Sequence, residues 1–117
     1  MSPFPNLRGA NYMSLATFRR DGTEVRTPVW FADNERGVVF FTNPKLGKVK
    51  RLRRDPRVRV APCTARGAVT GEWRDGRARF LEGDEARQAR AALKQKYWLA
   101  RLPIWFRSTT HVEVVPA

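Results

Sequence analysis

Short apolar stretches separated by polar turns fill the first two thirds of the chain. Three of them come first, at residues 12–18, 25–32 and 37–42, and they are divided by residues 20–22 (Arg-Asp-Gly) and 33–37. Runs of this length, rich in β-branched and aromatic residues and bounded by Gly and Asp, are typical of strands joined by tight turns. We therefore expect three antiparallel strands that follow one another in sequence order.

Pro28 falls inside the second of these stretches. Proline has no backbone N–H and cannot donate to a sheet ladder, so the strand must lie at a sheet edge or be bulged there. An open backbone at this point could meet a ligand.

The pattern continues with further strands. Residues 57–62 alternate, with Val58 and Val60 expected to face inward. Residues 69–73 and 77–81 flank a second Arg-Asp-Gly and predict a hairpin, and residues 109–115 alternate as a last strand.

A short helix is expected between the third and fourth strands. Asn43 suits the N-cap and Pro44 the first helical position, and the helix should end at Asp55-Pro56. Its buried stripe is expected to be Leu46, Val49 and Leu52. Gly47 costs about 1 kcal/mol inside a helix, which favours a start one or two residues later.

A second helix is expected over residues 84–98. Apolar residues recur there at helical spacing: Ala86, Ala89, Leu93 and Tyr97. The stretch that follows, WLARLPIWF (residues 98–106), is too short to span a membrane and too apolar to lie free in water. We expect it to cover a pocket or a partner subunit. Its residues Trp98, Trp105 and Phe106 are candidates to border the substrate, with dimer packing as the alternative.

Many short antiparallel strands with two helices predict a mainly β fold closed as a barrel, since closure removes sheet edges. At 117 residues the chain is expected to form one domain over residues 1–117, with residues 1–10 as a flexible arm or a short N-terminal helix.

Composition narrows the class of protein. Hydrophobic residues at 42% argue against disorder. The N-terminus lacks the charged start and apolar centre of a secretory signal, so a cytoplasmic protein is expected. Cys63 is the single cysteine, which excludes an internal disulfide and a cysteine-based metal site. We expect no metal.

Positive charge is concentrated in one segment. The chain has 23 Lys and Arg and 11 acidic residues. Residues 45–66 contain nine Lys and Arg and one acidic residue, which gives this segment a net charge of +8. Such a balance suits a nucleic acid, an anionic lipid or a phosphorylated small molecule, although charge runs often form a solvated face. The position of this cluster at a helix start favours phosphate.

Side chains for acid–base or nucleophilic catalysis are sparse. His111 is the single histidine and lies in the alternating last strand, where packing explains it better than catalysis, and Cys63 has no partner nearby in sequence. No set of nucleophile, base and orienting residue can be assembled. An enzyme of this sequence would therefore rely on a bound cofactor.

Residues 14–63, which begin SLATFRRDGTEVRTPVWF, resemble the core of the pyridoxamine-phosphate-oxidase-like split barrels. They resemble more closely the branch that binds the deazaflavin coenzyme F420. The motifs that carry the resemblance are TPVWF at residues 27–31 and T-x5-K-x3-L-x3-P at residues 42–56, and the likeness extends over about residues 12–81.

The resemblance implies a homodimer of split β-barrels with the cofactor held between subunits. By position, Thr42 and Lys48 match phosphate-binding residues and Arg26 matches a basic residue on the second strand. The backbone that lies along the flavin ring is matched by Thr27, Pro28, Val29 and Trp30. Asn43, the expected cap of the helix that carries Lys48, is a further candidate for cofactor binding. Gly47 replaces the phosphate-binding arginine of the family, with possible substitutes at Lys45, Lys50 or Arg53.

The implied activity is hydride transfer between reduced F420 and a small electrophilic substrate such as a quinone, an enone or a tetrapyrrole. F420 carries a phosphodiester and a polyglutamate tail, so the basic segment fits it better than FMN. The chain lacks the longer C-terminal arm of the vitamin oxidases, and pyridoxamine-phosphate oxidation is not expected.

Two alternatives stay open. One is an FMN-binding oxidoreductase, or a flavin-binding protein without turnover. The other is a nucleic-acid-binding module, in which basic residues contact phosphates and four aromatic residues stack on bases. Those residues are Trp30, Phe40, Phe41 and Trp73.

Overall fold

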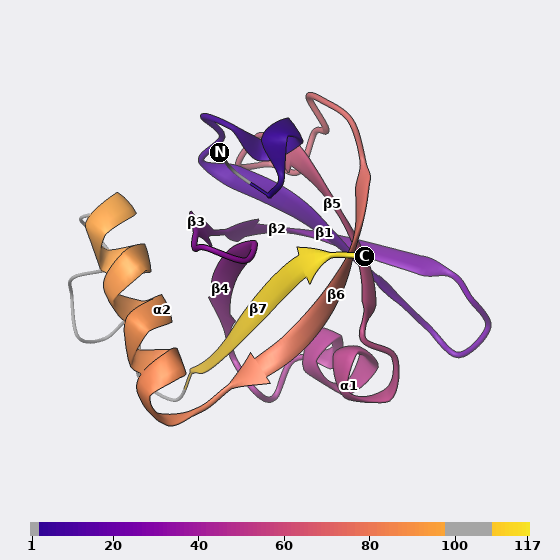
Figure 1. Ribbon diagram of the computed structural model, residues 1–117. Helices are drawn as coiled ribbons and strands as arrows, with labels where there is room; N and C mark the ends of the chain where they lie inside the picture. The colour runs from indigo at the N-terminus through magenta and orange to yellow at the C-terminus, as the bar shows by residue number, and fades with distance from the viewer. Residues whose placement is uncertain (1–2, 98–108) are drawn as a thin grey trace.

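In the computed structural model, which describes residues 3–97 and 109–117, seven strands form one antiparallel sheet (Figure 1). The strands are β1 (Tyr12–Phe18), β2 (Glu24–Trp30), β3 (Ala32–Asp33), β4 (Val38–Thr42), β5 (Arg57–Cys63), β6 (Arg74–Leu81) and β7 (Thr110–Pro116). Their order is β2-β1-β5-β6-β7-β4-β3. The helices of the described residues are η1 (Pro5–Leu7, 3-10), α1 (Gly47–Arg54) and α2 (Gly83–Lys96).

The sheet curls so that β2, at one end of the strand order, and β4, the last strand but one at the other end, contact each other without pairing. Fully buried apolar side chains from both halves fill the interior, among them Leu15, Val60, Phe40 and Val112. Helix α2 lies outside, against β3, β4 and β7 (Figure 1). The predicted mainly β split barrel is confirmed.

The first predicted hairpin is confirmed. β1 and β2 pair from Tyr12↔Trp30 to Phe18↔Glu24. The turn is closed by the Arg19 N–H, which donates to the Thr23 carbonyl at 2.9 Å, and Gly22 takes a φ of +87°. Glycine adopts that conformation without the steric cost of a side chain, so the Arg-Asp-Gly signal acts here as a true turn.

The expected pairing of the third strand with the second is found only at Ala32, which lies in the separate strand β3 and pairs with Val39, whereas no residue of β2 pairs with β4. β4 pairs with β7 along its whole length and with β3 only at Val38 and Val39. β2 remains an edge strand, as Pro28 predicted. Because Pro28 has no N–H to give, the free side of β2 is a poor partner for a regular ladder.

The second Arg-Asp-Gly is not a turn, and the predicted hairpin there is wrong. Residues 74–76 lie inside β6, paired with β5 and β7. A Cβ at Gly76 would lie 2.7 Å from Val114 Cγ1, so glycine is needed for close strand approach and not for chain reversal. The chain reverses earlier, at residues 64–68, where the Thr64 N–H donates to the Ala68 carbonyl.

Helix α1 begins later than predicted, at Gly47, with Leu46 as its cap residue. Asn43 does not cap the helix, because its Oδ1 accepts the Lys45 N–H at 2.9 Å and closes a separate turn. Val49 is buried as expected, but Leu46 is 46% exposed. The apolar stripe of α2 is confirmed, since Ala89 and Leu93 are buried against the sheet.

Of the two alternatives for the N-terminus, the short helix is the one observed. Phe4 and Leu7 flank and end η1 and are buried in the barrel core. The Asn6 amide donates to the carbonyls of Val60 and Glu72, which ties this segment to β5. None of the helices in the described segments has the length and apolarity needed to cross a membrane.

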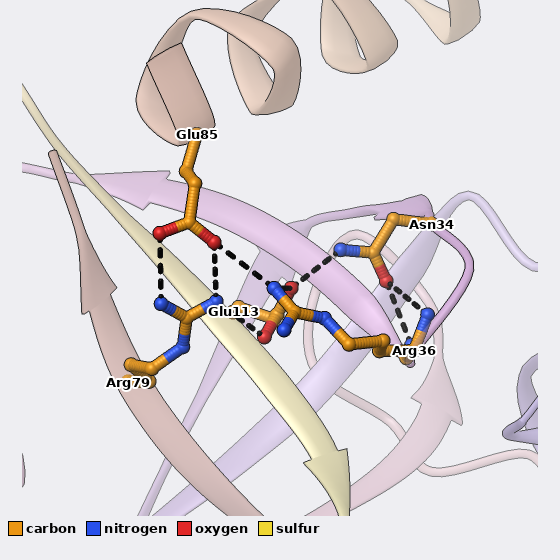
Figure 2. Close-up of polar contacts among 6 residues, drawn as sticks. Asn34, Arg36, Arg79, Glu85 and Glu113 are labelled. Carbon is orange, nitrogen blue, oxygen red and sulfur yellow. Dashed lines mark hydrogen bonds and ion pairs between the residues drawn. The ribbon is translucent and has the colours of Figure 1, made fainter. Parts of the chain in front are cut away.

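An ion network fixes α2 to the sheet (Figure 2). Glu113 on β7 is 3% exposed and accepts hydrogen bonds from Arg36, Arg79 and Asn34 at 2.8–3.1 Å. The same two arginines bind Glu85 in the first turn of α2 at 2.6–3.0 Å. Hydrogen bonds from Arg79 and then Arg36 lower the pKa of Glu85 to about 2.

This network predicts a loss of stability in acid. The pKa of Glu85 is lower in the folded than in the unfolded chain, where it is near 4.5. The contribution of Glu85 to the free energy of unfolding is therefore present above about pH 4.5 and is lost as the pH falls toward about 2. Urea unfolding across this range should show a shallower pH dependence for Glu85→Gln than for the wild type. Equal slopes for the two proteins would contradict the role of Glu85.

Candidate functional site

A pocket of about 380 Å³ lies where β2 meets β4 at the seam of the barrel. Six of its lining residues are ones that the sequence predicted for cofactor binding: Pro28, Val29, Trp30, Thr42, Asn43 and Lys48. Four others were not predicted as site residues: Tyr12, Phe41, Leu46 and Thr109. The structure therefore gathers the end of β4, the start of α1 and the edge of β2 around one cavity.

The polar end of the pocket holds a hydroxyl and an ammonium that lack partners. Thr42 is 5% exposed, and no group in residues 3–97 or 109–117 hydrogen-bonds to its Oγ1. Lys48 is half-buried and forms no ion pair with a carboxylate of these residues. Burial, and then the nearby charge of Arg51, lower the pKa of Lys48. An anion between these groups would supply what both lack.

Main-chain donors point to the same end. The first N–H groups of a helix have no intrahelical partner, and in α1 these belong to Gly47 and Lys48. The next N–H, that of Val49, donates to the Leu46 carbonyl. Free N–H groups at the positive end of a helix are suited to bind phosphate.

The side of the pocket formed by β2 offers unpaired backbone. Pro28 lies opposite Ser14 in the ladder with β1. In an antiparallel pair alternate residues turn their N–H and C=O groups to opposite sides, and Pro28 suits a position whose nitrogen faces away from β1. The main-chain groups of Arg26 and Pro28 then face the open side of the strand.

Aromatic rings form the wall next to this edge. The Trp30 ring stacks on that of Tyr97 with centroids 4.7 Å apart and an interplanar angle of 4°. Phe41 meets Trp30 edge-on at 6.3 Å, and Tyr12 lies at 6.5 Å. Such pairs add to the stabilisation from buried area and fix ring positions.

The Tyr97 hydroxyl fixes the backbone beside that wall. It accepts the Phe31 N–H at 3.1 Å and lies 2.6 Å and 2.7 Å from the carbonyl oxygens of Phe31 and Asn11. Burial raises the pKa of Tyr97 to about 12, so the hydroxyl keeps its proton. One side chain at the end of α2 thus joins the break between β2 and β3 to the start of β1.

Several predicted site residues are not among those that line the pocket. Arg26 binds Glu24 at 3.0 Å and lies over Trp73, and Arg53 lies over the Phe80 ring at 4.4 Å. The others placed outside the lining are Thr27, Lys45 and Lys50. The proposed substrate residues Trp98, Trp105 and Phe106 lie outside the described residues.

Signals for two of the missed residues were present in the sequence. The register of the first hairpin places Tyr12 opposite Trp30, and Phe41 precedes Thr42 on β4. The hydroxyl of Tyr97 gave no such signal, because its partners are 66 and 86 residues away in the chain.

No acid–base pair is found among the side chains that line the pocket. His111 is buried on β7, and burial, with the charge of Arg90, lowers its pKa. Burial raises the pKa of Cys63, which disfavours the reactive thiolate. A larger pocket of about 480 Å³ lies under α2, but the buried carboxylate there, Glu113, is already hydrogen-bonded.

Replacing Tyr97 with Phe should destabilise the protein by about 1 to 3 kcal/mol, because the Phe31 N–H loses its buried acceptor. The ring stack with Trp30 should survive. Chemical unfolding measures the first effect and the near-ultraviolet circular dichroism of the folded protein the second. An unchanged unfolding midpoint would show that the hydroxyl contributes nothing.

Comparison with known proteins gives no match among curated proteins. Several solved structures share the fold. The heme storage protein HutZ from Vibrio cholerae matches with a TM-score of 0.75 and 15% identity, over 100% of this chain and 92% of that chain. An FAD-binding protein from Mesorhizobium loti matches with a TM-score of 0.72 and 19% identity, over 96% and 85%.

A conserved hypothetical protein from Mycobacterium tuberculosis matches with a TM-score of 0.73 and 21% identity, over 95% of this chain and 76% of that chain. At these identities the likeness establishes the fold. The family model described as Pyridoxamine 5'-phosphate oxidase matches residues 5–116, nearly the whole sequence. Together with the split barrel and the seam pocket, this match shows that the chain belongs to the pyridoxamine 5'-phosphate oxidase family.

Proposed function

We propose that the pocket between β2 and β4 binds the deazaflavin coenzyme F420 and that the protein transfers hydride between this cofactor and a small electrophilic substrate. The observation that carries the proposal is the pairing of a buried, unpartnered Thr42 hydroxyl with a half-buried Lys48 that has no carboxylate partner in the described chain. Both groups are suited to a phosphate.

Each part of the pocket has a separate task in this proposal. Lys48, the Thr42 hydroxyl and the free N–H groups of α1 hold the phosphate. The open backbone of β2 hydrogen-bonds the edge of the ring system. The aromatic wall around Trp30 excludes water from one side of the ring.

The bound cofactor would supply the hydride. The protein then needs to orient two rings and exclude solvent, which agrees with the absence of an acid–base pair among the described lining residues. Quinones, enones and tetrapyrroles are the classes of substrate that suit such a transfer.

Charge favours F420 over FMN. Lys48 and its neighbours on α1 are cationic, and F420 carries carboxylates in addition to its phosphodiester. FMN is the second candidate, because its phosphate would need only the Thr42 and Lys48 groups. The FAD-binding relative from Mesorhizobium loti supports a flavin-type ligand in general.

The structure gives little support to base stacking by a nucleic acid. Phe40 is fully buried, and Arg26 and Arg59 lie over the ring of Trp73. Trp30 is stacked on Tyr97. The basic surface is then the remaining feature that supports binding of a nucleic acid.

Substituting Lys48 with Ala should lower F420 affinity by about 10- to 150-fold at low salt, because one charge-assisted hydrogen bond is lost. Fluorescence titration of wild type and variant measures the two dissociation constants. Lys50→Ala is the matched control, since Lys50 lies on the same helix but is exposed and outside the pocket lining.

The same titration with FMN and with heme shows which of the three cofactors the protein binds. F420 binding without FMN or heme binding supports the proposal. Tight FMN binding with no F420 binding would move the function to the second candidate, and equal F420 affinity in Lys48→Ala and wild type would place the anion elsewhere.

We also propose a homodimer, on the architecture that the resemblance implies. Light scattering at micromolar concentration should give twice the chain mass. A stable monomer that still binds cofactor would rule out a site shared between subunits.

A further inference from the structure

Arg51 lies beside the start of α1, although it is four residues further along the helix. A Cβ built on Gly47 would lie 3.0 Å from Arg51 Nη1. The guanidinium therefore occupies the space into which a side chain at position 47 would grow. Arg51 does not line the pocket, and neither do the cations that the sequence offered for this end of it, Lys45, Lys50 and Arg53. Arg51 differs from those three in that its guanidinium lies at Gly47, between two lining residues.

A hydrogen bond fixes Arg51 in this position. Its Nε donates to Thr17 Oγ1 at 2.7 Å, and Thr17 is a buried residue of β1. The Thr17 hydroxyl lies 3.5 Å from the Val25 carbonyl, which it can use as an acceptor. The guanidinium is thus held through one nitrogen, and its two other nitrogens have no hydrogen-bond acceptor within residues 3–97 and 109–117.

No carboxylate of the described residues neutralises Arg51. Ten other pairs of these residues form ion pairs, and Arg51 is in none of them. Its charged neighbours are cations instead: burial, and then the charges of Arg19 and Arg54, lower its pKa. A cation held among cations costs free energy unless an anion joins them.

The position of Gly47 connects this cation to the pocket. Gly47 lies between Leu46 and Lys48, which both line the pocket, and its N–H is one of the two free donors of α1. The charge of Arg51 is also near enough to Lys48 to affect it. Lys48 and Thr42 line the cavity, and the guanidinium of Arg51 lies beside this end of it, next to Gly47 at the start of the same helix.

We propose that Arg51 is the second cation of this anion site and that its guanidinium, together with Lys48, binds the phosphate of the ligand. The proposal rests on the proposed function, since it concerns the same pocket. Gly47 belongs to the arrangement because it leaves room for the guanidinium. A planar fork of donors suits phosphate oxygens better than a second ammonium would.

The experiment compares ligands with and without phosphate. Arg51→Met keeps the apolar stem and removes the charge, and Arg53→Met on the same helix is the matched control, because Arg53 lies over Phe80. F420 affinity should fall by about 10- to 150-fold in Arg51→Met and stay within about twofold in Arg53→Met. The deazaflavin chromophore that lacks the phosphodiester should bind both variants and wild type equally.

A second variant tests the spatial argument. Gly47→Arg in the Arg51→Met background returns a guanidinium to the vacated space and should restore much of the F420 affinity. Thermal unfolding of each variant shows whether it is folded.

Three results would overturn the inference. If Lys48→Ala weakens F420 binding and Arg51→Met does not, the proposed cofactor site is supported, but Arg51 does not bind the phosphate and serves only to hydrogen-bond Thr17. If Arg51→Met weakens the phosphate-free chromophore equally, its effect is structural. If neither substitution changes F420 binding, the proposed function fails together with the inference.

Discussion

The missing N–H of Pro28 is the constraint on which the arrangement of this barrel depends. A ladder between β2 and residues 40–42 of β4, which β3 does not cover, would close the sheet further, and a proline in β2 disfavours that ladder. The two strands touch without pairing, and the pocket occupies the resulting seam. The feature that leaves the sheet open is therefore also the feature that leaves main-chain groups free for a ligand.

The charged side chains at the seam are not neutralised in the way that those under α2 are. Under α2, two arginines and two glutamates neutralise one another, and the buried carboxylate is fully bonded. At the start of α1 the cations Lys48 and Arg51 lie close together without a carboxylate from the described residues. The first arrangement stabilises the fold, whereas the second places two cations close together without a neutralising charge from the described residues. Such local conflicts are typical of functional sites.

Sequence patterns predicted those features that depend on neighbours along the chain. The first hairpin, the alternation of β5 and the stripe of α2 follow from turn chemistry and from periods of 2 and 3.6 residues. The missing N–H of Pro28 marked that position as open to a ligand. Val29, Trp30, Thr42 and Lys48 came from the family resemblance, because their meeting with Pro28 depends on how the sheet curls.

Features that depend on distant contacts could not be predicted. β4 pairs with β7, which lies at the far end of the chain. Gly76 gives the same local signal as Gly22, yet packing against Val114 keeps it inside a strand. Arg51 and Tyr97 acquire their roles through Thr17, Phe31 and Asn11, which no local pattern connects to them.

The position of Trp30 has a consequence for spectroscopy. Its indole lines the pocket and its ring plane is nearly parallel to that of Tyr97. Indole emission overlaps the absorption of flavin-type rings, and resonance energy transfer falls with the sixth power of distance. A chromophore in the seam would therefore quench Trp30 more than a tryptophan farther away, so the protein carries its own optical reporter of occupancy.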